Sequence, residues 1–175
     1  MENYRLEGKT FVIDDYDRLP AFSSFLPGLA GVKGIPMWTF YTNRGQGMNS
    51  FGIDNKGNAI MEFNSANTAF ENTTVKGFRT FLTIDGEYYE PFFKYEDDAK
   101  RQIRMNKNSF KVIEKNEKYG IEITVNYYVL PNESIGALVR QVSIKNISGQ
   151  KKNIEIIDGL PKIITYGISN GEFKE

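Results

Sequence analysis

The sequence predicts an all-β protein that folds as an antiparallel β-sandwich. Apolar and polar residues alternate over long stretches of the second half, between residues 120 and 147. Asp85-Gly86 stands between two alternating runs, and this dipeptide favours a tight hairpin turn. Helical periodicity is weak throughout the chain. Long alternating strands joined by short turns, with little helix, are typical of sandwiches.

The first half of the chain contains shorter strand signals. Apolar runs at 10–13 and 37–41 predict two strands, the second one entered through Gly34-Ile35-Pro36. The runs at 49–53 and 58–63 flank the polar loop Asp54-Asn55-Lys56-Gly57, which predicts a hairpin with Gly57 at a positive φ.

The second half predicts a more regular set of strands. Residues 80–84 lead into the Asp85-Gly86 turn and then into 87–89. Further alternating runs predict strands at 109–114, 120–130, 137–147 and 153–157. One face of the 120–130 strand is apolar and is expected to point into the core; it carries Ile121, Ile123, Val125, Tyr127 and Val129.

Two segments carry weak helix signals. Residues 65–70 are expected to form one or two helical turns. Residues 96–104 place acidic residues before basic ones, which suits the dipole of a short helix. A solvated charged loop is the alternative interpretation of 96–104, and the sequence favours neither.

The C-terminal residues predict a sandwich that is incomplete. Residues 163–166 look like another apolar strand without a following partner. We therefore expect residues 1–175 to be a single N-terminal sandwich domain or a fragment of one. Ile163, Ile164 and Phe173 are expected to be covered by self-association, because unpaired apolar edges pair with other chains.

The composition excludes several kinds of function. Lys plus Arg and Asp plus Glu both number 22, so the net charge is zero, which argues against a nucleic-acid partner and a polybasic membrane anchor. No apolar run reaches the roughly 20 residues that a membrane helix needs. The chain has no histidine and no cysteine, so the commonest general base and thiolate chemistry are missing.

These observations also predict a compartment. The opening residues MENYRLEGK are polar and do not resemble a signal peptide, so we expect a cytoplasmic protein. Three glycosylation acceptor patterns, at Asn72, Asn132 and Asn146, are accordingly interpreted as chance matches.

Four acidic residues are candidates for chemistry. Asp14, Asp15 and Asp17 lie too close in sequence to flank a scissile bond, so we interpret them as turn caps and partners of Arg18. Glu62 lies between apolar neighbours and is interpreted as an ion-pair partner on the sheet surface, with a site role as the alternative.

The spacing of Gly28, Gly31 and Gly34 does not match a dinucleotide fingerprint, and no helix is expected to follow it. We interpret these glycines as a tight irregular loop.

The segment 38–46 contains the best candidates for ligand binding. Trp38 and Tyr41 supply aromatic rings, while Asn43, Arg44 and Gln46 supply amide and guanidinium groups. Aromatic faces stack on the C–H faces of sugars, and planar polar groups hydrogen-bond sugar hydroxyls. The five residues are therefore predicted carbohydrate contacts. The alternative for Arg44 is a structural role, in which it ties loops to backbone carbonyls.

Three stretches of the chain resemble a known family. The segment FVIDDYDRLPAFSSFLPGLAGVKGIPMWTFYTNRGQGMNSFGIDNKGNAIMEFNSANTAFENTTVKGFRTFL resembles the N-terminal region of bacterial glycoside phosphorylases of the cellobiose-phosphorylase class, glycoside hydrolase family 94. Within that class it is most similar to phosphorylases of 1,2-β-glucan oligosaccharides. The stretches ALVRQVSIKNIS and IEIIDGLPKIITYGIS are similar to the sandwich domain of the same family.

The resemblance implies a fold and a reaction for the parent protein. Members begin with a β-sandwich, followed by a helical linker and an (α/α)6 barrel that holds the active site. They cleave a β-glucosidic bond with inorganic phosphate, and they invert the anomeric centre to give α-glucose 1-phosphate. A barrel aspartate is the general acid, so no catalytic residue is expected in this chain.

The resemblance also implies partners for the chain. These are its own C-terminal barrel, a β-glucan oligosaccharide and a second subunit, with no cofactor or metal apart from phosphate as a substrate. The alternatives are a free-standing carbohydrate-binding module, a structural sandwich without a ligand, and the phosphorylase-like region of a cyclic β-1,2-glucan synthase.

Overall fold

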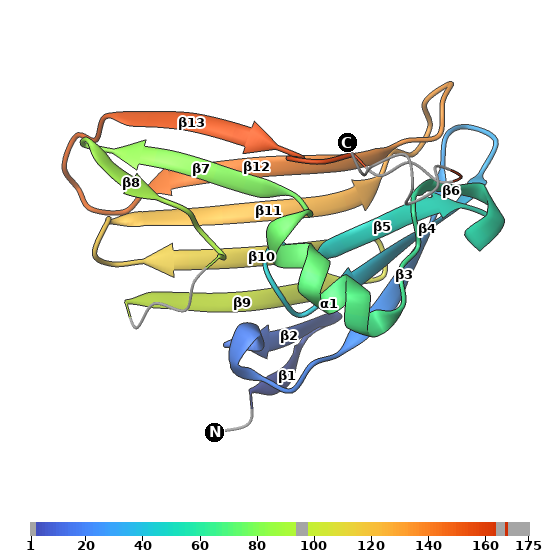
Figure 1. Cartoon of the computed structure of the whole chain (residues 1–175), viewed down its shortest axis with the longest axis horizontal. Helices are drawn as coiled ribbons and strands as arrows, with labels where there is room; N and C mark the ends of the chain where they lie inside the picture. Colours follow the sequence, from blue (N-terminus) through green and yellow to red (C-terminus); the bar gives the residue numbers. More distant parts are fainter. Residues whose placement is uncertain (1–2, 94–97, 164–166, 168–175) are drawn as a thin grey trace.

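The computed structural model describes residues 3–93, 98–163 and 167. Its strands form three sheets that are antiparallel throughout (Figure 1). The predicted all-β antiparallel sandwich is therefore confirmed.

The largest sheet has six strands in the order β1-β2-β9-β10-β11-β12. Their bounds are β1 Tyr4–Glu7, β2 Thr10–Asp14, β9 Ala99–Asn106, β10 Ser109–Asn116, β11 Ile121–Val129 and β12 Leu138–Asn146. A four-stranded sheet follows the order β3-β4-β5-β6 and a three-stranded sheet the order β13-β7-β8. These strands are β3 Ser23–Ala30, β4 Ile35–Thr42, β5 Met48–Ile53, β6 Ala59–Met61, β7 Arg79–Ile84, β8 Glu87–Tyr89 and β13 Ile154–Gly159.

The core lies between the six-stranded sheet and the two smaller sheets. Ile103, Val112 and Val125 pair across β9, β10 and β11 on one face of the large sheet, and all three have no exposed surface. Leu82 from β7 and Met48 from β5 pack into the same cluster. The predicted inward face of β11 is confirmed, because Ile121, Ile123, Val125 and Tyr127 are fully buried.

One helix and one turn confirm local signals in the sequence. The helical turns expected at 65–70 form the start of α1, Ala66–Val75, which is longer than predicted. The turn Asp85-Gly86 joins β7 to β8 with positive φ values of 50° and 91°, as a tight hairpin requires.

The hairpin between β5 and β6 differs from its prediction in one detail. The positive φ, 55°, falls on Asp54 and not on Gly57. Gly57 instead lies in the short 3-10 turn η2, Lys56–Asn58, where its N–H donates to Asn55 Oδ1 at 2.9 Å.

The predicted glycine loop is only partly a loop. Gly28 lies inside β3, where a side chain at this position would approach Val129 to 2.7 Å, so the glycine permits close contact with β11. Gly31 and Gly34 do lie in the turn before β4, with φ values of 69° and 65°.

The structure contradicts both interpretations of residues 96–104, a short helix and a solvated loop, in the part that it describes. The segment 99–104 is neither a helix nor a loop but the first part of β9, while residues 96–97 lie outside the described range. Ala99, Arg101 and Ile103 point into the core, and Lys100 between them is exposed. The alternation was hidden because one of the three inward residues is a charged arginine.

The last predicted elements fall partly outside the described residues. Ile163 is 65% exposed, in agreement with an apolar residue that lacks cover. Residues 164–166 and Phe173 are among those that the structure does not describe. Among the residues it does describe, no helix combines the length and apolar character needed to cross a bilayer.

A buried ion network joins β9 and β10 to the segments beside them. Arg101 donates to Glu114 at 2.5 Å and to Asp17 at 2.6 Å, and its side chain is only 5% exposed. Glu114 also accepts from the Tyr89 hydroxyl and from the Phe92 backbone N–H. Burial alone would lower the pKa of Arg101, but the carboxylates of Glu114 and Asp17 outweigh burial and raise it.

The acidic residues near the N-terminus either bind other side chains of the protein or begin a turn. Asp14 pairs with Arg5 and accepts from Gln102, so two of the three aspartates have partners far away in the sequence. Asp15 occupies the N-cap of the 3-10 turn η1, Tyr16–Arg18, without a side-chain capping bond.

Replacing Glu114 should destabilise the fold strongly. Glu114→Gln leaves the buried Arg101 charge without its closest counterion, and breaking a buried ion pair costs about 3–5 kcal/mol. The free energy of unfolding, measured by urea denaturation, should fall by that order. Lys115→Ala is the matched control on the same strand, because the Lys115 side chain is 44% exposed and its ion pair with Glu117 lies at the surface. Equal stability of Glu114→Gln and wild type would contradict the structural role of this network.

Candidate functional site

The loop 42–47 connects β4 to β5 and lies inside the protein. Asn43 has no exposed surface, and its side chain makes three hydrogen bonds. Its Nδ2 donates to the carbonyls of Tyr16 at 2.9 Å and Pro20 at 3.0 Å, while its Oδ1 accepts from the Phe22 N–H at 3.0 Å. One amide side chain therefore fixes the whole connection from β2 to β3.

Arg44 strengthens the same connection from the next position. Its guanidinium donates to the carbonyl oxygens of Asn43 at 2.8 Å and Leu19 at 3.0 Å. The group also lies over the ring of Phe70 in α1, 4.9 Å from the ring centroid. Arg44 is thus a half-buried cation with backbone and aromatic partners. This geometry fits the structural role given as the alternative, in which Arg44 ties loops to backbone carbonyls.

Gln46 links the loop to the two other sheets. Its Nε2 donates to Thr80 Oγ1 on β7 at 2.9 Å, and its Oε1 accepts from Arg140 on β12 at 2.6 Å. Only 2% of Gln46 is exposed. Its side-chain amide is therefore engaged at both ends by protein groups.

The two predicted aromatic contacts point to opposite sides of β4. Tyr41 faces the core, where its ring lies 4.6 Å from that of Phe110 and burial raises the pKa of its hydroxyl. Trp38 lies on the outer face and donates from Nε1 to the carbonyl of Asn55 at 3.2 Å. It packs edge-on against Phe25 and Phe63. The structure therefore places Tyr41, Asn43 and Gln46 inside the protein, with Arg44 half-buried beside them and Trp38 apart on the outer face of β4.

Two glycines make this buried loop possible. Gly45 and Gly47 have φ values of 51° and 84°. The Gly45 carbonyl accepts from the buried Tyr16 hydroxyl at 2.6 Å, and a side chain at Gly47 would lie 2.4 Å from the ring of Phe110. The absence of a side chain at Gly47 lets the loop approach the core this closely, and the positive φ favours glycine at both positions.

Arg140 is the residue of this region that sequence reasoning missed. It binds both carboxylate oxygens of Asp158 on β13, at 2.5 and 2.8 Å, and lies 4.8 Å from the centroid of Phe78. Thr80 donates to the same carboxylate at 2.6 Å. Burial alone would raise the pKa of Asp158, but the hydrogen bonds from Arg140 and Thr80 lower it overall. The sequence did contain a signal for this role, because Arg140 is a charged residue on the otherwise mainly apolar face of the predicted strand 137–147.

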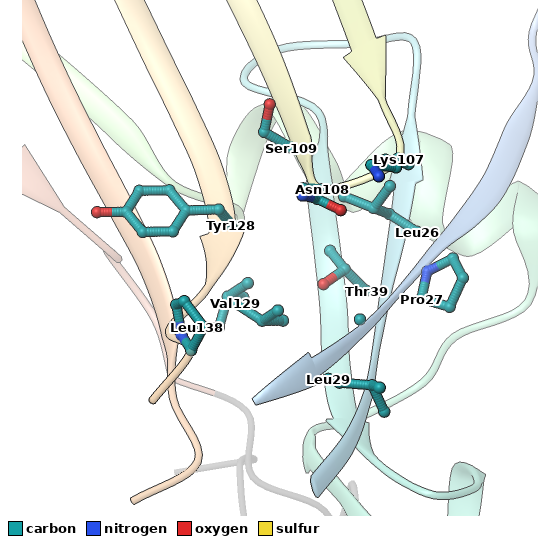
Figure 2. A pocket seen from close by; sticks show the side chains of 12 residues that line it. Leu26, Pro27, Leu29, Thr39, Lys107, Asn108, Ser109, Tyr128, Val129 and Leu138 are labelled. Carbon is teal, nitrogen blue, oxygen red and sulfur yellow. The ribbon is translucent and has the colours of Figure 1, made fainter. Parts of the chain in front are cut away.

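A separate cleft opens between β3 and the ends of β11 and β12 (Figure 2). Its volume is about 610 Å³, within the range of small-molecule sites. Leu26 and Leu29 from β3 form one wall, and Val129 and Leu138 form the other. The turn 107–109 supplies its polar rim with Lys107, Asn108 and Ser109, and none of the described residues that line it carries a carboxylate.

The chemistry of the cleft follows from this lining. It suits the apolar body of a ligand and offers one cation and a few hydrogen-bonding groups, without an acid–base pair. None of the five predicted carbohydrate contacts lines it.

Glu62 lies beside a much smaller cavity of about 20 Å³. Asn49, Asn64 and Lys76 share this cavity, and Asn49 Oδ1 is buried without a hydrogen-bond partner in the described part of the chain. The space and its polar lining suit a single water molecule. Across residues 3–93, 98–163 and 167, no three acidic residues gather as metal ligands would.

Comparisons with protein-family models and with curated proteins found no match to this chain. The function therefore has to be argued from the fold, the buried loop and the resemblance described above.

Removing the Asn43 side chain should destabilise the sandwich. Asn43→Ala removes the side-chain partner of the Phe22 N–H and of the Pro20 carbonyl. The Tyr16 carbonyl also loses one of its two donors and keeps the Leu19 N–H. We expect a loss of about 2–4 kcal/mol in the free energy of unfolding. Arg44→Ala should cost more than about 1 kcal/mol, because charge-assisted bonds to backbone are lost. Thermal and urea unfolding measure both. Asn67→Ala in exposed α1 surface is the control, and wild-type stability of Asn43→Ala would contradict the role of the loop.

Acid should weaken the Arg140–Asp158 pair. The pKa of Asp158 is lower in the folded chain than the value of about 3.9 in an unfolded one. Its contribution to stability is therefore complete above about pH 4 and is lost as the pH falls through the folded pKa. The stability difference between wild type and Asp158→Asn should shrink below about pH 4. The difference for Gln150→Ala, a control that removes an exposed side chain without a titratable group, should not change over this pH range.

Proposed function

We propose that this chain is the non-catalytic N-terminal β-sandwich domain of a bacterial glycoside phosphorylase. The parent enzyme would phosphorolyse β-glucan oligosaccharides to α-glucose 1-phosphate. The domain's task is to support the catalytic barrel and the sugar site that the barrel holds.

The observation that carries this proposal is that the polar side chains of the 42–47 loop bind groups of the protein itself. The side-chain groups of Asn43, Arg44 and Gln46 bind the protein's own backbone and side chains. This loop lies in the segment with the most specific resemblance to the family. A segment built to fix its own domain suits a supporting role, and the antiparallel sandwich is the fold that the resemblance implies.

The chain's own residues also favour a non-catalytic role. Inverting phosphorolysis needs a general acid and a phosphate site, with phosphate in the place that water holds in an inverting hydrolase. The buried Glu114 is held by Arg101 and the Tyr89 hydroxyl, and Asp158 is held by Arg140. Neither carboxylate lines the cleft of about 610 Å³. The acid and the phosphate ligands are therefore assigned to the barrel of the parent.

The cleft between β3 and β11 favours a second candidate function, a carbohydrate-binding or other small-ligand module. Its size fits a small ligand, and its rim carries hydrogen-bonding groups. Its walls are mainly aliphatic and Tyr128 is the one aromatic residue among the described residues that line it, whereas sugar sites usually contain several aromatic faces, so this function ranks second.

The purified chain should release no glucose 1-phosphate from 1,2-β-glucan oligosaccharides with phosphate. The longer protein encoded by the same gene should release it, which a coupled assay for glucose 1-phosphate detects. Asn43→Ala in that protein should lower the temperature at which activity is lost. Activity of the chain alone would overturn the non-catalytic role. Calorimetric binding of oligosaccharides to the chain, abolished by Leu26→Asp in the cleft, would favour the second function.

A further inference from the structure

The six-stranded sheet turns a polar and positively charged face away from the core. Along β9, β10 and β11, buried residues alternate with exposed or half-buried ones, and the latter form this outer face together with their partners on β12. The chain as a whole has equal numbers of acidic and basic residues. On these four strands, however, the outer face carries one acid, Glu122, and the cations Lys100, Arg104, Lys111, Lys115 and Lys145.

The acids of the neighbouring strands do not neutralise this excess of positive charge. Glu7 of β1 and Asp14 of β2 both pair with Arg5. Glu7 also pairs with Arg104 at the edge of the face. Three cations further across the sheet make no ion pair with any described residue, namely Lys100, Lys111 and Lys145.

Like charges stand directly opposite each other at two places on this face. Lys100 lies opposite Lys115, and Arg104 lies opposite Lys111, both between β9 and β10. Such pairs destabilise a sheet. Lys115 has a counterion in Glu117, at 3.2 Å, but this acid lies in the turn and not between the two lysines. The free protein therefore carries a repulsion that an anion bound on this face would relieve.

The spacing of the unpaired lysines selects an extended anion. Lys100 and Lys145 end a cross-strand row that runs through Lys115 and Glu122. They lie three strands apart, which is about 14 Å. Lys111 is four residues along β10 from this row, which is also about 14 Å. One small anion cannot contact all three lysines, whereas a polymer with a negative charge on successive units can.

Neutral hydrogen-bonding groups fill the space between the lysines. Thr124 and Asn126 of β11 lie opposite Ser143 and Gln141 of β12. The side-chain oxygen Oδ1 of Asn126 is buried and has no hydrogen-bond partner in the described part of the chain. A buried acceptor without a donor is costly, and a hydroxyl group of a ligand would satisfy it. Hydroxyl groups together with repeated negative charges are the chemistry of an acidic polysaccharide.

Other polyanions match this face less well. Single-stranded nucleic acids bind where bases stack on aromatic rings, and on the outer positions of β9–β12 Tyr128 is the one aromatic residue. Protein interfaces have an apolar centre, whereas Ile113 and Val139 are the aliphatic residues at these positions. The wide spacing of the lysines also suits one charge per sugar unit better than a densely sulfated chain.

We propose that the outer face of the six-stranded sheet binds a polysaccharide of uronic acid units. Lys100, Lys111 and Lys145 would face its carboxylates, and Asn126 would accept a hydrogen bond from one of its hydroxyl groups. This site is separate from the cleft beside β3, which none of these four residues lines. The binding would belong to this chain itself, whether or not the parent enzyme is a phosphorylase.

Calorimetric titration of the purified chain with polygalacturonate oligosaccharide tests the proposal. Binding should be present at low ionic strength and should weaken as salt is added, because exposed charges are screened. Lys111→Gln and Lys145→Gln should each weaken binding about fivefold, the effect of one lysine beside an anionic surface. Lys56→Gln is the matched control, since Lys56 is an exposed lysine in η2, and its affinity should equal that of wild type. The methyl-esterified oligosaccharide, which lacks the charges, should not bind.

Lys100→Glu supplies a second test with opposite effects on stability and binding. It places an acid opposite Lys115, so the free variant should unfold at a higher temperature than wild type. Polygalacturonate should raise the unfolding temperature of wild type and raise that of Lys100→Glu much less. Circular dichroism confirms that each variant is folded.

Three results would overturn the proposal. They are the absence of polygalacturonate binding at low salt, unchanged affinity in the combined variant Lys100→Gln, Lys111→Gln and Lys145→Gln, and tighter binding of a single-stranded oligonucleotide than of polygalacturonate. None of these results depends on release of glucose 1-phosphate by the longer protein, so the two proposals fail separately.

Discussion

The buried loop between β4 and β5 is the constraint on which the rest of the structure depends. It belongs to the four-stranded sheet, yet its side chains bind each of the other layers. Asn43 holds the connection from β2 to β3, and Gln46 reaches Thr80 on β7 and Arg140 on β12. Apolar contacts alone allow sheets to slide over each other, whereas buried hydrogen bonds tolerate only one arrangement because unpaired polar groups are costly. The loop therefore fixes how the three sheets are stacked.

The resulting core is complete on one side and open on the other. Across β9, β10 and β11 the inward residues have essentially no exposed surface, and the buried pair of Arg101 and Glu114 is enclosed by neighbours. Towards β12 and β13 the same inward faces become half-exposed. Among the described residues, Arg140 and Asp158 bridge the two sheets on this side, and the same arginine binds Gln46 of the loop.

The sequence predicted most of the strands because their alternation is independent of what they pack against. The strand 120–130 and the turn at Asp85-Gly86 are recognisable for this reason, and both are confirmed. β9 was not recognised, because the inward position of Arg101 breaks the alternation and is explained only by carboxylates at positions 17 and 114. Sequence pattern is local, whereas the partners that allow a charge to be buried are distant.

The same limit applies to the predicted carbohydrate contacts. Amide and guanidinium groups that suit a sugar also suit a bundle of backbone carbonyls, since both present several acceptors in fixed positions. Residue type indicates only that Asn43, Arg44 and Gln46 can make several directed hydrogen bonds; in the structure they make them to groups of the chain, and their role as carbohydrate contacts stays a prediction. The partners Tyr16, Thr80 and Arg140 come from three different parts of the sequence.

The buried loop 42–47 and the cleft beside β3 are separate features, and this separation has a functional consequence. The cleft is lined mainly by aliphatic residues of β3, β11 and β12, and Gly28 of β3 lies close to Val129 of β11 beside it. The hydrogen bonds from Gly31 to Leu130 and from Val32 to Glu133 hold these segments together at 2.8 Å. Because this contact does not involve the 42–47 loop, the cleft and the loop can be altered independently. If substitutions in the loop lower stability and leave ligand binding in the cleft unchanged, the loop is a scaffold. If substitutions in the cleft abolish ligand binding and leave stability unchanged, the cleft is a binding site.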